Sequence, residues 1–268
     1  MPQKEVVEAF DQISTVYDAT RDPLDAGTVD AMASHLKERG IRSILEVGVG
    51  TGRVSLPLLA RGFEMTGVDA SRRMLSFARS KGLHRLIRGD AFRLPFADGT
   101  FDTTLFVHVL HLLERTSEAL AEARRVSRRG VSALVHPNDP RRSDPAEGRT
   151  LDSRKIVYRY LAREGFPVQD RDGGPRAREH RLLNELPPDE LVVLSDREVT
   201  ERLSKQLDVF ERRGSRHTLS IPEDVLHRAT EAARAEIGDR TVTYRRIEAL
   251  AIWGRRPDRA DGPRLDSG

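Results

Sequence analysis

A glycine-rich segment near residue 50 is the part of this sequence that could bind a ligand most directly. It reads EVGVGTG from Glu46 to Gly52, and Gly48, Gly50 and Gly52 alternate within it. A short apolar run precedes the segment and a helical pattern follows it. Glycines at such a strand-to-helix turn let a ligand approach the backbone closely. Taken alone, the glycines are compatible with nicotinamide and flavin cofactors.

Two details of this segment argue against a dinucleotide. The dinucleotide fingerprint requires a small residue three positions after its second glycine, and in the two possible frames this position is Arg53 or Ser55. Arginine breaks the pattern, whereas serine is a near miss. The carboxylate of Glu46 would repel a pyrophosphate, but it suits a cofactor that carries an ammonium and a sulfonium.

Two further acidic residues stand where the next two apolar runs end. Asp69 lies in GVDAS, nineteen residues after Gly50, close to the roughly 20 expected for a carboxylate that accepts hydrogen bonds from ribose hydroxyls. Asp90 follows in GDA, where it is placed to accept from an adenine amino group. Either residue alone could be a solvated loop residue, but both together with the glycine segment predict a nucleoside-binding edge.

The elements that must position these residues alternate between short apolar runs and helical patterns, which predicts a parallel sheet covered by helices. We expect strands at 44–47, 64–68, 85–87, 103–109 and 131–135. Helices are expected at 53–61, 71–81 and 117–126, after two N-terminal helices, of which the first ends near Tyr17 and the second opens at Pro23. Later in the chain we expect a strand at 206–212, a helix at 222–237 and a final strand at 249–253.

Composition limits the class of protein. A chain of 268 residues fits one α/β domain with an insertion, so we expect a single domain over 1–268. No cysteine occurs, which excludes disulfides, thiolate metal sites and cysteine nucleophiles. The N-terminus lacks an apolar signal core, and no stretch approaches the roughly 18 apolar residues that a membrane span needs. We expect a soluble, cytoplasmic protein, and the sequence leaves its oligomeric state open.

Four stretches resemble the class I S-adenosylmethionine-dependent methyltransferases, especially the small-molecule branch that includes the ubiquinone and menaquinone biosynthesis enzymes. They are ILEVGVGTGRVSLPLL, GVDASRRMLSFAR, GDAFRLPFADGTFDTTLFVHVLHLL and, more loosely, EARRVSRRG, within residues 10–137. The resemblance implies a Rossmann-like α/β fold with strand order 3-2-1-4-5-7-6, strand 7 antiparallel, and an insertion after strand 5. It also implies S-adenosyl-L-methionine as cofactor. RRG at 128–130 departs from the KPGG usual in this family.

The resemblance assigns roles to single positions. The glycine loop would bind the methionine part of the cofactor, Asp69 the ribose, and the residues around Ser71 and Asp90 the adenine. Tyr17 and Arg21, in VYDATRD, match a pattern that covers the methionine end, where Arg21 could bind the carboxylate bidentately. The cofactor-binding candidates are therefore Tyr17, Arg21, Glu46, Gly48, Gly50, Gly52, Asp69, Ala70, Ser71, Met74, Asp90 and Ala91. Filling the core is an equally good role for Met74.

Two histidines are candidates for catalysis. Methyl transfer is an in-line displacement that needs no covalent residue, although a general base helps when the acceptor must lose a proton. His108 follows strand 4 and His136 ends strand 5, at the edge where ligands of such sheets bind. His111 falls where the family commonly has a histidine, which favours a structural role. Asn138 and Asp139 follow His136, but no third ligand has suitable spacing, so we predict no metal.

Residues 140–188 lose the strand rhythm, and we expect a lid-like inserted segment there that contains a helix at 151–163. The tail at 257–268 lacks an apolar core and is expected to be disordered. The expected acceptor is an unidentified small molecule. Arginines of the insertion suggest a nucleic-acid methyltransferase as an alternative, but they alternate with acidic residues and few aromatics accompany them. A non-catalytic module that binds S-adenosylmethionine is the other alternative.

Overall fold

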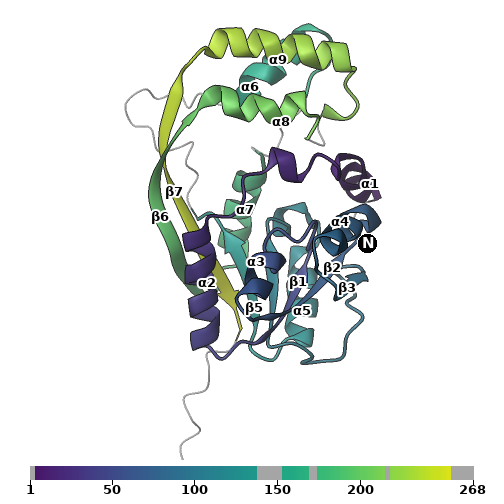
Figure 1. Ribbon diagram of the computed structural model, residues 1–268, viewed down its shortest axis with the longest axis vertical. Helices are drawn as coiled ribbons and strands as arrows, with labels where there is room; N and C mark the ends of the chain where they lie inside the picture. Colours follow the sequence, from purple (N-terminus) through teal and green to yellow (C-terminus); the bar gives the residue numbers. More distant parts are fainter. Residues whose placement is uncertain (1–3, 138–152, 169–173, 215–217, 255–268) are drawn as a thin grey trace, which may run out of the picture.

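The computed structural model describes residues 4–137, 153–168, 174–214 and 218–254. One sheet of seven strands organises the chain, in the order β3-β2-β1-β4-β5-β7-β6 (Figure 1). Strand β7 runs antiparallel to both of its neighbours, and the other pairs are parallel. The predicted Rossmann-like order is therefore confirmed. The strands are β1 (Ser43–Val47), β2 (Glu64–Asp69), β3 (Leu86–Arg88), β4 (Thr103–Val107), β5 (Val131–Val135), β6 (Glu190–Arg202) and β7 (Thr241–Trp253).

Helices cover both faces of the sheet and form two hydrophobic cores. Helices α2 (Ala26–Glu38), α3 (Ser55–Ala60) and α4 (Arg72–Ser80) contribute to the first core, and α5 (Thr116–Val126) and α7 (Gly174–Glu185) contribute to the second. Successive strand residues point to opposite faces, so Leu134 of β5 lies in the first core and Ala133 in the second. Burial on both faces explains why the central strands read as continuous apolar runs.

The predicted helix boundaries hold to within a few residues, and capping side chains mark the starts of two helices. Helix α2 begins after Asp25, whose carboxylate accepts a hydrogen bond from the Thr28 N–H, rather than at Pro23. It ends before Gly40, which has a φ of +67°. Ser71 caps α4 in the same way by accepting from the Met74 N–H. The first helix, α1 (Lys4–Ile13), ends earlier than expected, and a short 3-10 helix, η1 (Asp18–Thr20), follows it.

A helical layer lies at the far end of the long β6–β7 ribbon, above the sheet in Figure 1. It consists of α6 (Ser153–Arg163), the 3-10 helix η4 (Leu203–Leu207), α8 (Asp208–Glu211) and α9 (Glu223–Ile237), which we call the cap. These elements share a third hydrophobic core of their own. The strand predicted at 206–212 is wrong, because Leu207 and Phe210 are buried at helical spacing in η4 and α8.

The segment predicted as an inserted lid over 140–188 contributes to two places. Its helix α6 packs on α9 in the cap, whereas its helix α7 covers the sheet. Residues 140–152 and 169–173 of that segment, and the tail at 257–268, lie outside the described residues. The domain division therefore stays a prediction. None of the described helices is long and apolar enough to span a membrane.

Candidate functional site

The glycine loop joins β1 to α3 in a conformation that favours glycine. Gly48, Gly50 and Gly52 all have positive φ angles, of 74°, 55° and 81°. A Cβ atom at Gly48 would lie 2.6 Å from Cγ2 of Val109, the residue after His108. The loop therefore needs glycine at position 48 for both conformation and space, and it lies directly against the segment that follows β4.

Glu46 lies inside the protein beneath this loop. Its residue is 2% exposed, and the Ser55 hydroxyl donates a hydrogen bond to its Oε2. Burial raises the pKa of the Glu46 carboxyl to about 8, despite the hydrogen bonds from Ser55. The side chain is therefore largely neutral at pH 7, although the positive charge of Arg53 acts in the opposite direction.

Asp69 ends β2 and connects the glycine loop to the start of α4. Its Oδ2 accepts from the Gly50 N–H at 2.8 Å, and its Oδ1 accepts from the Ser71 N–H at 2.8 Å. Burial raises the pKa of this carboxyl, although the two backbone hydrogen bonds act in the opposite direction. The structure thus brings together three positions that the sequence had predicted for one site.

The remaining positions predicted around the adenine follow β2 and β3 at the same edge. In the pairing of β2 with β3, Asp69 lies opposite Arg88, so Asp90 follows two residues later at the same edge. Oδ1 of Asp90 accepts a hydrogen bond from the Phe92 N–H at 3.1 Å. Ala70 is half-buried, and Ala91 packs on the second core. Met74 is 2% exposed, which agrees with a role in filling the core. These contacts leave the adenine roles as predictions.

The N-terminal segment reaches the glycine loop through a residue that the sequence analysis did not select. Asp18 of η1 accepts from the Thr51 hydroxyl at 2.6 Å and forms an ion pair with Lys81, which also donates to the Thr51 carbonyl. Burial alone would raise the pKa of Asp18, but hydrogen bonds from Lys81 and Thr51 outweigh it and lower that pKa. In the sequence, only the position of Asp18 between the predicted residues Tyr17 and Arg21 could have marked it as a candidate.

The side chain of Arg21 points toward the cap. Its guanidinium lies 5.2 Å from the centre of the Tyr17 ring and donates to the Gly214 carbonyl at 3.2 Å. Tyr17 also contacts Phe10 edge to face. The two predicted residues therefore touch each other, but the described contacts do not direct Arg21 at the glycine loop.

The two predicted catalytic histidines come together at the carboxyl ends of β4 and β5. Their rings stack with centroids 5.2 Å apart and an interplanar angle of 14°. His108 is exposed and has a φ of +53°, which is rare for a residue with a side chain. His136 is largely buried, and two carboxylates contact it: Oε2 of Glu179 lies 3.5 Å from Nδ1, and Oε1 of Glu248 lies 3.9 Å from Nε2.

Sequence reasoning missed both of these carboxylates. Glu179 is on α7 and Glu248 is on β7, and neither belongs to a motif. The sequence does not reveal how β5 pairs with β7. In this pairing Ala249 lies opposite Val135, which places Glu248 beside His136. Within the described parts of the chain, no three histidine or acidic residues are grouped so that they could hold a metal ion.

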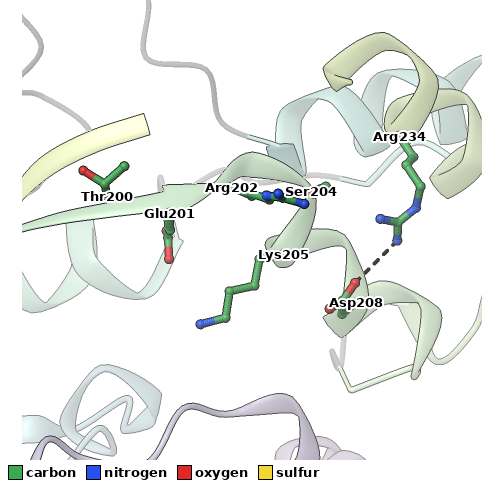
Figure 2. Close-up of a pocket in the computed structure, with 7 residues that line it drawn as sticks. All are labelled: Thr200, Glu201, Arg202, Ser204, Lys205, Asp208 and Arg234. Atoms are coloured by element: carbon green, nitrogen blue, oxygen red, sulfur yellow. Dashed lines mark hydrogen bonds and ion pairs between the residues drawn. The ribbon is translucent and has the colours of Figure 1, made fainter. Parts of the chain in front are cut away.

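A separate cavity of about 430 Å³ lies where the ribbon meets the cap (Figure 2). Its lining is charged and contains none of the predicted site residues. Figure 2 shows Lys205 extending from η4 and the contact of Arg234 with Asp208, which measures 3.4 Å. Lys205 pairs with Asp22 of the N-terminal segment, so its charge is already matched. The lining residues are Thr200, Glu201, Arg202, Ser204, Lys205, Asp208 and Arg234.

Comparison with known proteins identifies the family. Residues 45–135 match the family described as "Methyltransferase domain". A demethylmenaquinone methyltransferase of Renibacterium salmoninarum is 31% identical over 191 residues, which cover 62% of this chain and 79% of the relative. The chain belongs to the class I S-adenosylmethionine-dependent methyltransferases. The matched family region runs from β1 to β5 and includes Glu46, the glycine loop, Asp69, Asp90 and His108.

Other relatives of this methyltransferase match shorter regions or the fold alone. A phosphatidylethanolamine N-methyltransferase of Cereibacter sphaeroides is 39% identical over 110 residues, covering 38% of this chain and about half (53%) of the relative. The YcgJ protein of Bacillus subtilis superimposes with a TM-score of 0.51 at 18% identity, over 85% of this chain and 99% of that protein. The predicted enzyme class and its cofactor, S-adenosyl-L-methionine, are thus confirmed, whereas the acceptor is not specified.

Proposed function

We propose that this methyltransferase methylates a small molecule bound at the carboxyl ends of β4 and β5, beside the glycine loop. The observation that carries the proposal is the stacked pair His108 and His136 at these two strand ends. Strand β4 pairs with β1, and a Cβ atom added at Gly48 would collide with Val109. The histidines and the cofactor loop therefore share one edge of the sheet. In open α/β sheets ligands bind at this edge.

The described residues fit S-adenosylmethionine, which supplies a methyl group activated by a sulfonium when it is bound. The loop glycines leave the backbone open to close approach, and buried Glu46 offers a carboxyl group that a nearby cation would draw into its charged form. Asp69 has a carboxylate already oriented by two backbone N–H groups. The proposed cofactor-binding residues are Tyr17, Arg21, Glu46, Gly48, Gly50, Gly52, Asp69, Ala70, Ser71, Met74, Asp90 and Ala91.

The charges on the cap favour a small molecule over a nucleic acid. Several described arginines of the cap are paired with acidic side chains, as in Arg159 with Glu236 and Arg228 with Glu164. Nucleic-acid binding gains most of its affinity from unpaired basic residues. The relatives' printed names, which specify demethylmenaquinone and phosphatidylethanolamine, agree with a small acceptor.

A transfer assay with radiolabelled S-adenosylmethionine tests this function. The acceptor panel contains phenols, aromatic amines and acidic carbon compounds, and RNA and DNA are measured beside them. We expect label in a small molecule and none in nucleic acid. Replacing His136 with alanine should lower kcat about 10²- to 10⁴-fold, the range for a lost general base, and the exposed His84→Ala is the matched control. Label in RNA or DNA, or full activity in His136→Ala, would contradict the proposal.

A further inference from the structure

We infer that Glu179 and Glu248 are positioning residues that hold His136 as the proton acceptor during methyl transfer. The inference rests on the proposed function, because it concerns the same acceptor edge. It goes further by requiring an acceptor whose methylated atom carries a proton: a hydroxyl, an amine or an acidic C–H group.

Glu179 holds both the backbone and the ring of His136. Its Oε2 accepts from the His136 N–H at 3.2 Å and lies 3.5 Å from Nδ1 of the same residue. Glu179 is 7% exposed, so its charge has little access to water. A buried carboxylate is costly unless hydrogen-bond donors satisfy it, and a proton on Nδ1 supplies such a donor. Because Glu179 lies 3.5 Å from Nδ1 whereas Glu248 lies 3.9 Å from Nε2, the nearer carboxylate favours the ring form with the proton on Nδ1 and leaves Nε2 to accept a proton.

Glu248 faces the opposite side of the ring and is itself held in place. The Thr28 hydroxyl at the start of α2 donates to Oε2 of Glu248 at 2.7 Å, and Nη2 of Arg197 lies 3.7 Å from the same oxygen. Oε1 is left facing Nε2 of His136 at 3.9 Å. Glu248 is 4% exposed. Helix α2 and strand β6 thus fix the carboxylate that lies nearest to the free nitrogen of the ring.

His108 completes the enclosure by covering one face of the His136 ring. Its left-handed backbone conformation is unfavourable for a residue with a side chain, and strained backbone of this kind gathers at functional sites. The ring of His136 therefore has a carboxylate at each nitrogen and an imidazole on one face. Three separate segments supply these contacts: α7, β7 and the residues that follow β4.

This arrangement supports methyl transfer coupled to loss of a proton from the acceptor. The acceptor atom forms a bond to the methyl carbon while the carbon–sulfur bond breaks, and its electron pair stays on sulfur. The proton of the acceptor passes to Nε2 of His136. The resulting imidazolium then faces Oε1 of Glu248 and Oε2 of Glu179, and opposite charges at this distance in a buried setting stabilise it.

Nitrogen NMR of the His136 ring tests the inference on the full chain saturated with S-adenosylhomocysteine. His136→Asn identifies the two ring signals. In the wild type at alkaline pH we expect the protonated nitrogen to be Nδ1, with the two signals well separated. Glu179→Ala should bring the signals together as the second tautomer appears, whereas Glu185→Ala, an exposed position on the same helix, should not. Should Glu179→Ala fail to fold, Glu179→Gln should shift the signals in the same direction by less.

Glu248 is tested in parallel. Glu248→Gln should move the Nε2 signal and, in the small-molecule transfer assay, lower kcat tenfold or more while the KM for S-adenosylmethionine stays within twofold. The exposed Glu198→Gln on β6 is its control. A wild-type ring protonated on Nε2, or spectra and kcat unchanged in the Glu179 and Glu248 variants, would overturn the inference. The transfer assay reports separately on the proposed function, because label in RNA or DNA would contradict that function whatever the ring signals show.

Discussion

Replacing Glu46 with glutamine is expected to remove a steep loss of stability between about pH 4.5 and pH 8. Burial raises the pKa of Glu46 to about 8 in the folded protein, from an ordinary value of 4.5. Between these values the folded chain holds a proton that the unfolded chain has released. The free energy of unfolding therefore falls as pH rises, by about 1.4 kcal/mol per pH unit from this group. Its contribution is complete below pH 4.5 and is lost by pH 8.

Urea unfolding of both proteins at pH 5, 6, 7 and 8 measures this effect. Other groups titrate in both proteins, so the difference between the two profiles isolates Glu46. Glutamine retains an oxygen that can accept from the Ser55 hydroxyl. We expect the variant to gain stability over the wild type as pH rises. Parallel profiles would show that Glu46 is ionised throughout, and they would contradict the role of burial.

Replacing Asp69 with alanine is expected to weaken binding of S-adenosylhomocysteine by about 1.5–3 kcal/mol, or roughly tenfold to 150-fold, the scale of hydrogen bonds to a charged group. The carboxylate is proposed to accept from the ribose, and it already orients the Gly50 and Ser71 N–H groups. Its removal therefore takes away the ligand's acceptor and also the link between the glycine loop and α4.

Calorimetry measures the affinity, and Asp30→Ala is the control because that carboxylate is exposed and pairs with Arg61 at the surface. Urea unfolding of Asp69→Ala separates a loss of binding from a loss of folding. If the variant keeps its fold and binds as tightly as the wild type, Asp69 is not part of the cofactor site.

The elements that could be predicted from the sequence are those whose burial leaves a simple pattern. Strand β5 was predicted with its exact bounds because all five of its residues, 131–135, are buried. The glycine loop and Asp69 were predicted as one site from the glycine pattern between a strand and a helix and from the spacing of Asp69, and the structure joins them by a hydrogen bond. The position of β7 between β5 and β6 came from the family resemblance, since nothing in 249–253 indicates its direction.

The misses have physical causes as well. Strand β6 alternates exposed and half-buried residues, and its apolar run at 191–194 is short and is followed by mostly charged and polar residues. The strand predicted nearby, at 206–212, was a misreading of residues buried at helical spacing in the cap. The contacts of His136 with Glu179 and Glu248 join residues 43 and 112 positions apart, and only the register of β7 and the packing of α7 bring them together.

Calorimetric titration of the full chain with S-adenosylmethionine, and with S-adenosylhomocysteine, measures whether the glycine-loop edge of the sheet binds this cofactor. We expect heat from both ligands, with one site per chain. Because a positively charged ligand near Glu46 would favour its ionised form, binding of S-adenosylmethionine should also release a proton at pH 7 and tighten as pH rises toward 8. No heat from either ligand at millimolar concentration would contradict the account.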